Sequence, residues 1–302
     1  MAHQEGARPQ KPLQSGQGPL VTAETIGSVL KSSEAWLARR GVDQPRVDAG
    51  SLLAAALGME RLQLYLETDR PLQETELARF RPLLAARGRR QPLAQILEKK
   101  GFWTLEFKVS DQVLTPRADT ETLVEWALEI ETPDEARVID LCTGSGCIIA
   151  ALASERPNWQ LAATELSPSA LALARENLDA LGFMARVHLE QGDLFAGLDG
   201  PFDLIVANPP YVAESEASQL DPEVRQYEPE LALFATGEGL DVLRRIAQES
   251  LARCTTGTWL LMEHGHEQGA AVRALLDEAG FKDIDTRRDL GQRERVSGGR
   301  SP

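Results

Sequence analysis

The chain has 302 residues, of which 42% are hydrophobic and 26% are charged, and its formal net charge is −14. This composition is ordinary for a globular protein, and the length favours two domains over one. The acidic balance argues against DNA or RNA as the main partner, because nucleic-acid binding relies on basic surfaces that neutralise phosphates. No apolar run reaches about 18 residues, so we expect no transmembrane helix and no membrane partner.

The first 19 residues are rich in Gln, Gly and Pro and lack the apolar stretch of a signal peptide. We expect residues 1–19 to form a disordered tail. The three cysteines, at positions 142, 147 and 254, show neither metal-binding spacing nor an even disulfide framework. This usage favours a reducing compartment, so the sequence predicts a cytoplasmic protein.

Residues 20–92 are predicted to form a small helical bundle domain. Apolar residues recur with helical spacing from Ile26 to Leu37, and the segments 49–57 and 73–86 have the same character. No obvious catalytic group occurs in this part of the chain.

Basic residues cluster at the end of this domain. Five arginines lie between positions 79 and 90, and Lys99 and Lys100 follow. The cluster can be a solvent-exposed helix end whose charges interact favourably with the helix dipole. It can also be a contact surface for an acidic protein or an RNA-bound partner.

Residues 93–116 alternate between apolar and polar side chains, which predicts a β-hairpin linker with its turn near Ser110 and Asp111. Pro116 ends this pattern. A helix is then predicted from Asp119 through Leu128.

From residue 137 the pattern alternates between strands and helices. This order predicts an α/β fold with an open, mostly parallel sheet and helices on both faces, whose ligands bind at the carboxyl ends of the strands. The predicted strands are 137–141, 160–164, 187–190, 202–207, 258–262 and a segment near 283–287, and the predicted helices are 147–154, 169–181, 240–254 and 268–279.

A glycine-bearing loop joins the first of these strands to its helix, with the sequence Asp-Leu-Cys-Thr-Gly-Ser-Gly at 140–146. Glycines let the backbone approach a ligand, and the helix N-terminus favours a carboxylate or phosphate. The dinucleotide fingerprint needs a further glycine at 149, where this chain has isoleucine, and the Lys-Ser/Thr ending of a P-loop is missing. The loop therefore fits a small amino-acid moiety better than a pyrophosphate.

Acidic residues follow the next two strands. Glu165 lies 19 residues after Gly146, where a carboxylate can accept hydrogen bonds from both ribose hydroxyls of an adenosine. Asp193 can accept from an adenine amino group, with Leu194 and Phe195 beside the ring. The alternatives are an ordinary strand-end carboxylate for Glu165 and a common turn for Asp193.

The most informative motif is Asn208-Pro209-Pro210-Tyr211, directly after the strand 202–207. Two prolines lack N–H donors and fix φ, so they form a rigid corner that directs some carbonyls outward. The Asn208 amide adds one acceptor and two donors. The motif predicts a site for a planar group that carries an NH2, with an aromatic ring beside it.

Together these loops resemble the class I methyltransferases that depend on S-adenosyl-L-methionine (SAM). The Asn-Pro-Pro-Tyr motif narrows the resemblance to enzymes that methylate an adenine or cytosine amino group or a glutamine amide. Further segments are similar to the release factor glutamine methyltransferases (the PrmC/HemK family), over residues 22–297: 91–97, 102–103, 113–121, 227–229, 237–240, 263–265 and 289–296.

The resemblance implies a Rossmann-like methyltransferase domain at 117–297, a short tail at 298–302, and methylation of the glutamine amide nitrogen (N5) in the Gly-Gly-Gln loop of peptide chain release factors. The implied partners are these factors, without direct DNA binding, and we expect a monomer in which the helical domain docks the factor. The implied SAM-binding residues are Cys142, Thr143, Gly144, Ser145, Gly146, Glu165, Asp193, Leu194 and Asn208, and the implied product of SAM is S-adenosyl-L-homocysteine. The implied glutamine-binding residues are Arg117, Asn208, Pro209, Pro210 and Tyr211.

Three positions depart from the family's usual residues. The family has Gly at the position of Cys142, Asp at that of Glu165 and Pro at that of Ala118. Because side chains disfavour positive φ, we expect a negative φ at Cys142.

Several alternatives remain open. The first is a glutamine methyltransferase of a ribosomal protein, which shares the Asn-Pro-Pro-Tyr motif. The second is a nucleic-acid adenine methyltransferase, which would need base flipping and a basic groove, and the net charge opposes it. The third is a SAM-binding scaffold without turnover, which the intact motif opposes because a scaffold needs no amide-holding corner. His264 and His266 are candidates for a general base or for zinc ligands. The sequence has no third ligand at zinc spacing, so we expect no metal.

Overall fold

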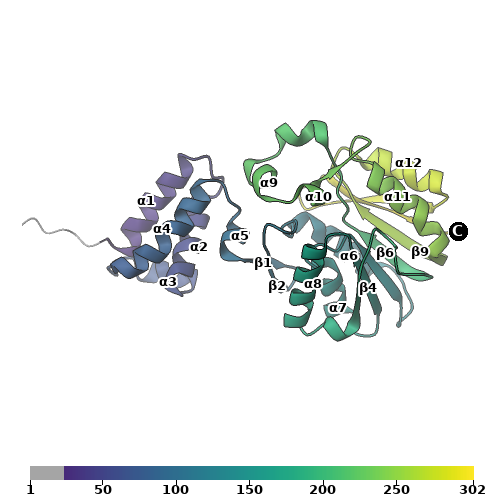
Figure 1. Ribbon diagram of the computed structural model, residues 1–302, viewed down its shortest axis with the longest axis horizontal. Helices are drawn as coiled ribbons and strands as arrows, with labels where there is room; N and C mark the ends of the chain where they lie inside the picture. The colour runs from purple at the N-terminus through teal and green to yellow at the C-terminus, as the bar shows by residue number, and fades with distance from the viewer. Residues whose placement is uncertain (1–23) are drawn as a thin grey trace, which may run out of the picture. The chain divides into compact units, whose positions relative to one another are not determined.

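The computed structural model describes residues 24–302, so the predicted tail at 1–19 lies outside the described residues. The described residues divide into two compact units, the first ending at Pro82 and the second running from Leu83 to Pro302 (Figure 1). None of the helices in the described part is both long and apolar enough to cross a membrane.

The first unit is helical, as the sequence predicts. It contains α1 (Ile26–Ala38), α2 (Pro45–Leu57), α3 (Arg61–Leu66) and most of α4 (Glu74–Gly88). Thr25 and Ser28 form a capping box at the start of α1, and Gly58 ends α2 with a φ of 65°. Fully buried side chains from all four helices, including Leu37, Leu52, Leu64 and Phe80, form its core.

After the last residues of α4, the second unit continues with a short helix and a hairpin. These are α5 (Leu93–Leu97), β1 (Lys99–Phe102) and β2 (Leu105–Lys108). The predicted turn near Ser110 is wrong, because the strands pair up to Phe102 and Leu105 and turn at Trp103-Thr104. Trp103 has a φ of 56°, and its N–H donates to Glu121, which fixes a two-residue turn that the side-chain pattern hides.

A seven-stranded sheet forms the centre of this unit, with the order β10-β11-β9-β6-β3-β4-β5. Five neighbouring strands are parallel, and β11 runs antiparallel to β9 and β10. The strands are β3 (Arg137–Leu141), β4 (Gln160–Glu165), β5 (Val187–Gln191), β6 (Phe202–Ala207), β9 (Cys254–Glu263), β10 (Lys282–Arg288) and β11 (Glu294–Arg300).

Helices cover both faces of the sheet (Figure 1). Alternate residues of one strand enter two different cores: Val138 packs with α6 (Glu121–Glu129), α7 (Cys147–Glu155) and α8 (Pro168–Ala180), whereas Ile139 packs with α11 (Asp241–Ser250) and α12 (Gly269–Ala279). This is the period-two burial of a strand that is covered on both sides.

Short elements complete the unit. They are η1 (Ala118–Thr120), η2 (Met184–Arg186), β7 (Val212–Ala213), η3 (Glu214–Gln219), α9 (Pro222–Tyr227), α10 (Glu230–Leu233), β8 (Phe234–Ala235) and η4 (Leu251–Arg253). The predicted tail at 298–302 needs correction, because β11 continues to Arg300 and pairs with β9 through Gly298 and Gly299.

The chain passes from β3 through β4 to β5 on one side and then returns to place β6 beside β3. This reversal is a topological switch point, and in open parallel sheets ligands bind in the crevice at the carboxyl ends of the strands there. The fold therefore places a crevice beyond Leu141 and Ala207, the last residues of β3 and β6.

Candidate functional site

A cavity of about 260 Å³ lies at this switch point. The loops after β3, β4, β5 and β6 all contribute to its wall, as expected at the carboxyl ends of the strands of a parallel sheet. Of the predicted residues, Arg117, Cys142, Thr143, Gly144, Ser145, Glu165, Asp193, Leu194, Asn208 and Pro210 line it.

The glycine-bearing loop forms one part of the wall. The Thr143 hydroxyl donates to Asp140 Oδ2 at 2.5 Å, and Gly146, with a φ of 80°, immediately precedes α7. The expectation of a negative φ at Cys142 is wrong, since its φ is 58°. The chain reverses directly after β3, and this left-handed turn brings the Thr143 N–H to the Thr164 carbonyl at 3.0 Å.

The buried Glu165 carboxylate holds two loops together. Oε2 accepts the Gly144 N–H and Oε1 accepts the Ser167 N–H, each at 2.9 Å. A carboxylate has about four lone-pair positions, so two remain for a ligand hydroxyl. The longer side chain of glutamate therefore reaches both backbone donors and still faces the cavity.

Asp193 and Leu194 form the wall after β5. The half-exposed Asp193 carboxylate pairs with Arg245 of α11, at 2.8 and 3.3 Å. This ion pair raises the pKa of Arg245. Leu194 is buried and has a φ of 52°. The sequence did not suggest Arg245, because a cation on an amphipathic helix gives no site signal.

Asn208 lies at the centre of the site, directly after β6. Its Nδ2 donates to Thr120 Oγ1 at 3.3 Å. Its Oδ1 is buried and has no hydrogen-bond partner among residues 24–302. A buried acceptor without a partner is costly, so this atom is prepared to receive a donor from a ligand.

The rest of the motif lies beside Asn208 in different environments. Pro210 lines the cavity, whereas Pro209 is buried and Tyr211 is half-buried, and neither is part of the lining. The Tyr211 hydroxyl donates to Glu263 Oε1 at 3.1 Å. Burial raises the pKa of Tyr211, and the neighbouring Glu263 adds to this effect, so the phenol stays protonated and remains a donor.

Glu263, at the end of β9, is almost fully buried. Burial raises the pKa of this carboxyl to about 7, although the Thr120 hydroxyl, Arg295 and the Tyr211 hydroxyl act in the opposite direction. The sequence identified Glu263 only within a family signature and assigned it no role. Its only individual signal was an acidic residue at the end of an apolar strand.

A segment at 221–234, which we call the wall segment, completes the cavity. Its lining residues are Pro229, Leu231, Ala232 and Phe234. Glu228 of this segment is buried and accepts from Arg117 Nη2 at 2.6 Å. Arg117, a predicted substrate residue, therefore faces the cavity while it is paired with the wall.

Only part of the arginine cluster is exposed at the protein surface. Arg87 and Arg90 pair with Glu223 of the wall segment, at 3.0 and 2.6 Å, and Arg87 is 7% exposed. The exposed Arg81 pairs with Glu74. The explanation of the whole cluster as a solvent-exposed helix end or as a contact surface is therefore wrong for Arg87 and Arg90, because both arginines pair with the partly buried carboxylate of Glu223.

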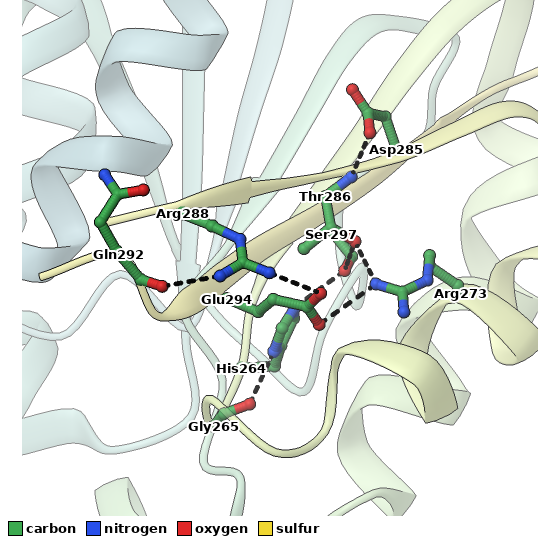
Figure 2. A network of polar contacts seen from close by, with 9 residues as sticks. All are labelled: His264, Gly265, Arg273, Asp285, Thr286, Arg288, Gln292, Glu294 and Ser297. Carbon is green, nitrogen blue, oxygen red and sulfur yellow. Dashed lines mark hydrogen bonds and ion pairs between the residues drawn. The ribbon is translucent and has the colours of Figure 1, made fainter. Parts of the chain in front are cut away.

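His264 does not line the cavity. Its Nδ1 contacts the Gly265 carbonyl and its Nε2 contacts Ser297 Oγ, both at 2.8 Å (Figure 2). Burial lowers its pKa, so the ring is neutral. Within residues 24–302 no three His, Cys, Asp or Glu side chains are grouped to hold a metal ion.

Comparisons with known proteins cover both units. Residues 28–97 match the family model of the PrmC N-terminal domain, and residues 119–224 match that of the methyltransferase small domain. Among solved structures, the hMettl16 catalytic domain is similar with a TM-score of 0.56 and 18% identity, over 72% of this chain and 81% of that one. At this identity the structural similarity shows the fold alone.

Curated relatives are similar over nearly their whole length. The release factor glutamine methyltransferase of Geobacter sulfurreducens is 44% identical over 91% of this chain and 96% of its own. That of Cereibacter sphaeroides is 43% identical over 90% of this chain and 97% of its own. The chain therefore belongs to the release factor glutamine methyltransferase family.

Proposed function

We propose that this protein transfers a methyl group from SAM to the side-chain amide nitrogen (N5) of the glutamine in the Gly-Gly-Gln loop of peptide chain release factors. The observation that carries the proposal is Asn208, which lines a cavity of a methyltransferase fold and whose buried Oδ1 lacks a partner among the described residues. An amide N–H of the substrate is the donor that this oxygen lacks.

The residues at the cavity wall fit SAM. The cavity-lining loop at 142–145 would hold the amino-acid moiety, the remaining lone pairs of Glu165 would accept from ribose hydroxyls, and Asp193 and Leu194 would hold the adenine. When bound, SAM supplies a methyl group that is already strongly electrophilic.

What the protein must contribute is the orientation of a poor nucleophile. An amide nitrogen shares its lone pair with its carbonyl, so it attacks slowly unless hydrogen bonds draw electron density onto it. Asn208 Oδ1 and the Pro209 carbonyl accept the two N–H groups, which aims the nitrogen at the methyl carbon. Contact between the Tyr211 ring and the amide plane remains a prediction.

No strong base is required at the nitrogen, because the proton leaves after methyl transfer. The positions of Tyr211 and Glu263 support this view, since neither residue is part of the cavity lining. The rigid Pro209-Pro210 corner maintains the geometry, because proline fixes φ. The site therefore acts by positioning and by hydrogen bonding.

The proposal is tested with Asn208→Ala. Removing one preorganised hydrogen-bonding group from an active site costs about 3–4 kcal/mol of barrier, so kcat should fall by roughly 10² to 10³ while the SAM Kd changes little. Asn158→Ala, an exposed asparagine before β4, serves as the matched control and should keep full activity. A turnover of Asn208→Ala near that of the unaltered chain would contradict the role of the amide.

The substrate is tested separately. Labelled SAM is offered with a release factor, a ribosomal protein fraction and DNA in parallel reactions, and the products are identified by mass spectrometry. The proposal predicts label on one glutamine of the release factor. Label confined to a ribosomal protein or to DNA would refute the proposed substrate and leave the fold unaffected.

A further inference from the structure

The corner from Asn208 to Tyr211 must keep its place relative to the sheet, because Asn208 and Pro210 line the cavity. Its first end is fixed, since Asn208 directly follows β6, whose last residue pairs with both β3 and β9. Its second end, at Tyr211, continues into β7, which belongs to a separate two-stranded sheet. We propose that Gln268 is a positioning residue that fixes this second end through the Tyr211 carbonyl, a role that rests on the function proposed above.

The first support is the set of contacts that the Gln268 side chain makes at the start of α12. Its Oε1 accepts the Gly265 N–H at 2.9 Å. Its Nε2 donates to the Tyr211 carbonyl at 2.9 Å and to the Glu238 carbonyl at 3.4 Å. A carboxamide has one acceptor oxygen and two N–H donors, and here each of these groups has a partner. Gln268 therefore ties the end of the motif to two other loops.

The orientation of the Gln268 amide is decided by these partners. A backbone N–H can only donate and a carbonyl can only accept, so the flipped amide would lose all three hydrogen bonds. The support is itself held, because the Gly265 carbonyl accepts the Gln268 N–H at 2.9 Å and lies 2.8 Å from His264 Nδ1 (Figure 2). Gly265 is thus bonded at both its N–H and its carbonyl, and Gln268 starts from a fixed point.

The second support is the close approach of the backbone around Gln268. Gly239 has a φ of 81°, and a Cβ at this position would overlap the Tyr211 carbonyl oxygen and lie 2.7 Å from Gln268 Nε2. A Cβ at Gly265 would lie 3.1 Å from Gln268 Oε1. Glycine permits both the positive φ and the close approach at 239. The Tyr211 carbonyl therefore lies in a confined place and meets a donor there.

The third support is the other polar group of Tyr211. Its hydroxyl donates to Glu263 Oε1 at 3.1 Å, so Tyr211 is bonded both to the end of β9 and, through Gln268, to the loop that follows β9. Because proline fixes φ, the two prolines of the motif would carry a displacement of Tyr211 back toward Asn208. Gln268 thus acts on the residues of the cavity wall without lining the cavity itself.

Gln268→Glu removes only the donor. The new carboxylate can still accept the Gly265 N–H, but it cannot donate to the Tyr211 carbonyl. At about pH 8, kcat should fall by about 10- to 100-fold, while the SAM Kd and the release factor KM stay within about 3-fold. Gln248→Glu makes the same change at an exposed glutamine of α11 outside the cavity lining, and it should keep full kcat.

A pH profile separates positioning from a general structural defect. A protonated carboxyl regains one O–H donor, and a partly buried carboxyl that faces carbonyls is protonated more readily than one in water. The kcat of Gln268→Glu, relative to that of the unaltered chain, should therefore rise at least about 3-fold from about pH 8 to about pH 6. Gln268→Met has neither donor nor acceptor, so it should show the loss at both pH values. It also takes the place of Gln268→Glu if that variant does not fold.

Two results would overturn the inference: full kcat in either variant at about pH 8, or a loss in Gln268→Glu that stays the same at about pH 6. The ratios are measured with whichever substrate the unaltered chain labels, a release factor, a ribosomal protein or DNA. Label on one of the other substrates would therefore refute the proposed function and leave the test of Gln268 valid. Label on none of them would refute both.

Discussion

Two non-glycine residues at the cavity wall, Cys142 and Leu194, have positive φ values of 58° and 52°. A left-handed conformation costs an L-residue roughly 1–2 kcal/mol, so the surrounding contacts must enforce it. Leu194 is buried and Cys142 packs against the same core, which holds both turns in place. Core packing therefore holds these two turns of the cavity wall.

This strain predicts an unusual order of stability at position 142. Glycine adopts positive φ without penalty, whereas alanine keeps the strain and loses the sulfur contacts. Cys142→Gly should therefore be more stable than Cys142→Ala by about 1 kcal/mol. Chemical denaturation of both variants measures the difference. An alanine variant that equals or exceeds the glycine variant in stability would show that the turn carries no strain.

Glu263 predicts a pH dependence of stability. Its pKa is raised to about 7 in the folded chain, mainly by burial, from an ordinary value of 4.5. Between these values the folded chain binds a proton that the unfolded chain has released, so stability decreases as pH rises through 7 and then levels off. Glu263→Gln stays neutral and should lack this decrease.

The measurement is the free energy of unfolding from pH 5 to 8 for both proteins. The difference between them isolates Glu263 from Asp140, whose pKa burial also raises to about 7. Relative to Glu263→Gln, the unaltered chain should lose about 2 kcal/mol over this range. Parallel curves would mean that Glu263 is ionised throughout.

At the scale of elements, the wall segment at 221–234 is fastened along its length. Glu223 pairs with Arg87 and Arg90, the Tyr227 carbonyl accepts from Gln95 at 2.9 Å, and Glu228 pairs with Arg117. Each anchor comes from the chain between 87 and 117. The segment that closes the cavity is thus fixed by the linker that precedes the sheet.

Breaking the first anchor should disturb substrate binding more than cofactor binding. Glu223→Gln leaves two largely buried guanidinium groups without their carboxylate, so we expect a loss of about 2 kcal/mol in stability and a release factor KM raised several-fold. Glu230→Gln makes the same change at an exposed residue of α10 and serves as control. Equal KM values in the two variants would show that this anchor does not shape the wall.

Elements with regular apolar patterns were predicted correctly from the sequence. The strands 137–141 and 202–207 match β3 and β6, because strands buried on both faces read as continuous apolar runs. The wall segment was missed because α9 and α10 are short and charged, and their structure depends on anchors that are distant in sequence. No local pattern encodes such anchors.

Strand β11 was missed for another reason. Its interior contains Gly298 and Gly299, which local propensity assigns to a turn or tail. A Cβ at Gly298 would lie 3.0 Å from the Trp126 ring, and one at Gly299 would lie 2.8 Å from Phe281. The glycines are therefore required by close packing across the sheet, which only the assembled fold reveals.

At the scale of the whole molecule, ligands of a parallel sheet bind at the carboxyl ends of its strands, and this rule was enough to locate the site formed by four loops that are distant in sequence. It could not supply Thr120, Glu263 or Arg245, because their roles depend on hydrogen bonds and ion pairs between side chains far apart in the chain. The sequence thus predicted most of its named site residues at what proves to be the cavity lining, and the structure adds the side chains that they contact.

The two units are expected to bind different ligands. We propose that the helical unit docks the release factor, since it carries no cavity-lining residue in the described part of the chain. A chain that begins at Leu83 keeps Arg87 and Arg90 for Glu223, so it should bind SAM within about 3-fold of the full chain but bind the release factor at least about 10-fold more weakly. A chain that begins at Gln91 loses both arginines and should also be less stable, by about 2 kcal/mol. Calorimetry with SAM and with a release factor measures both affinities, and an unchanged release factor Kd for the chain from Leu83 would show that docking resides in the methyltransferase unit itself.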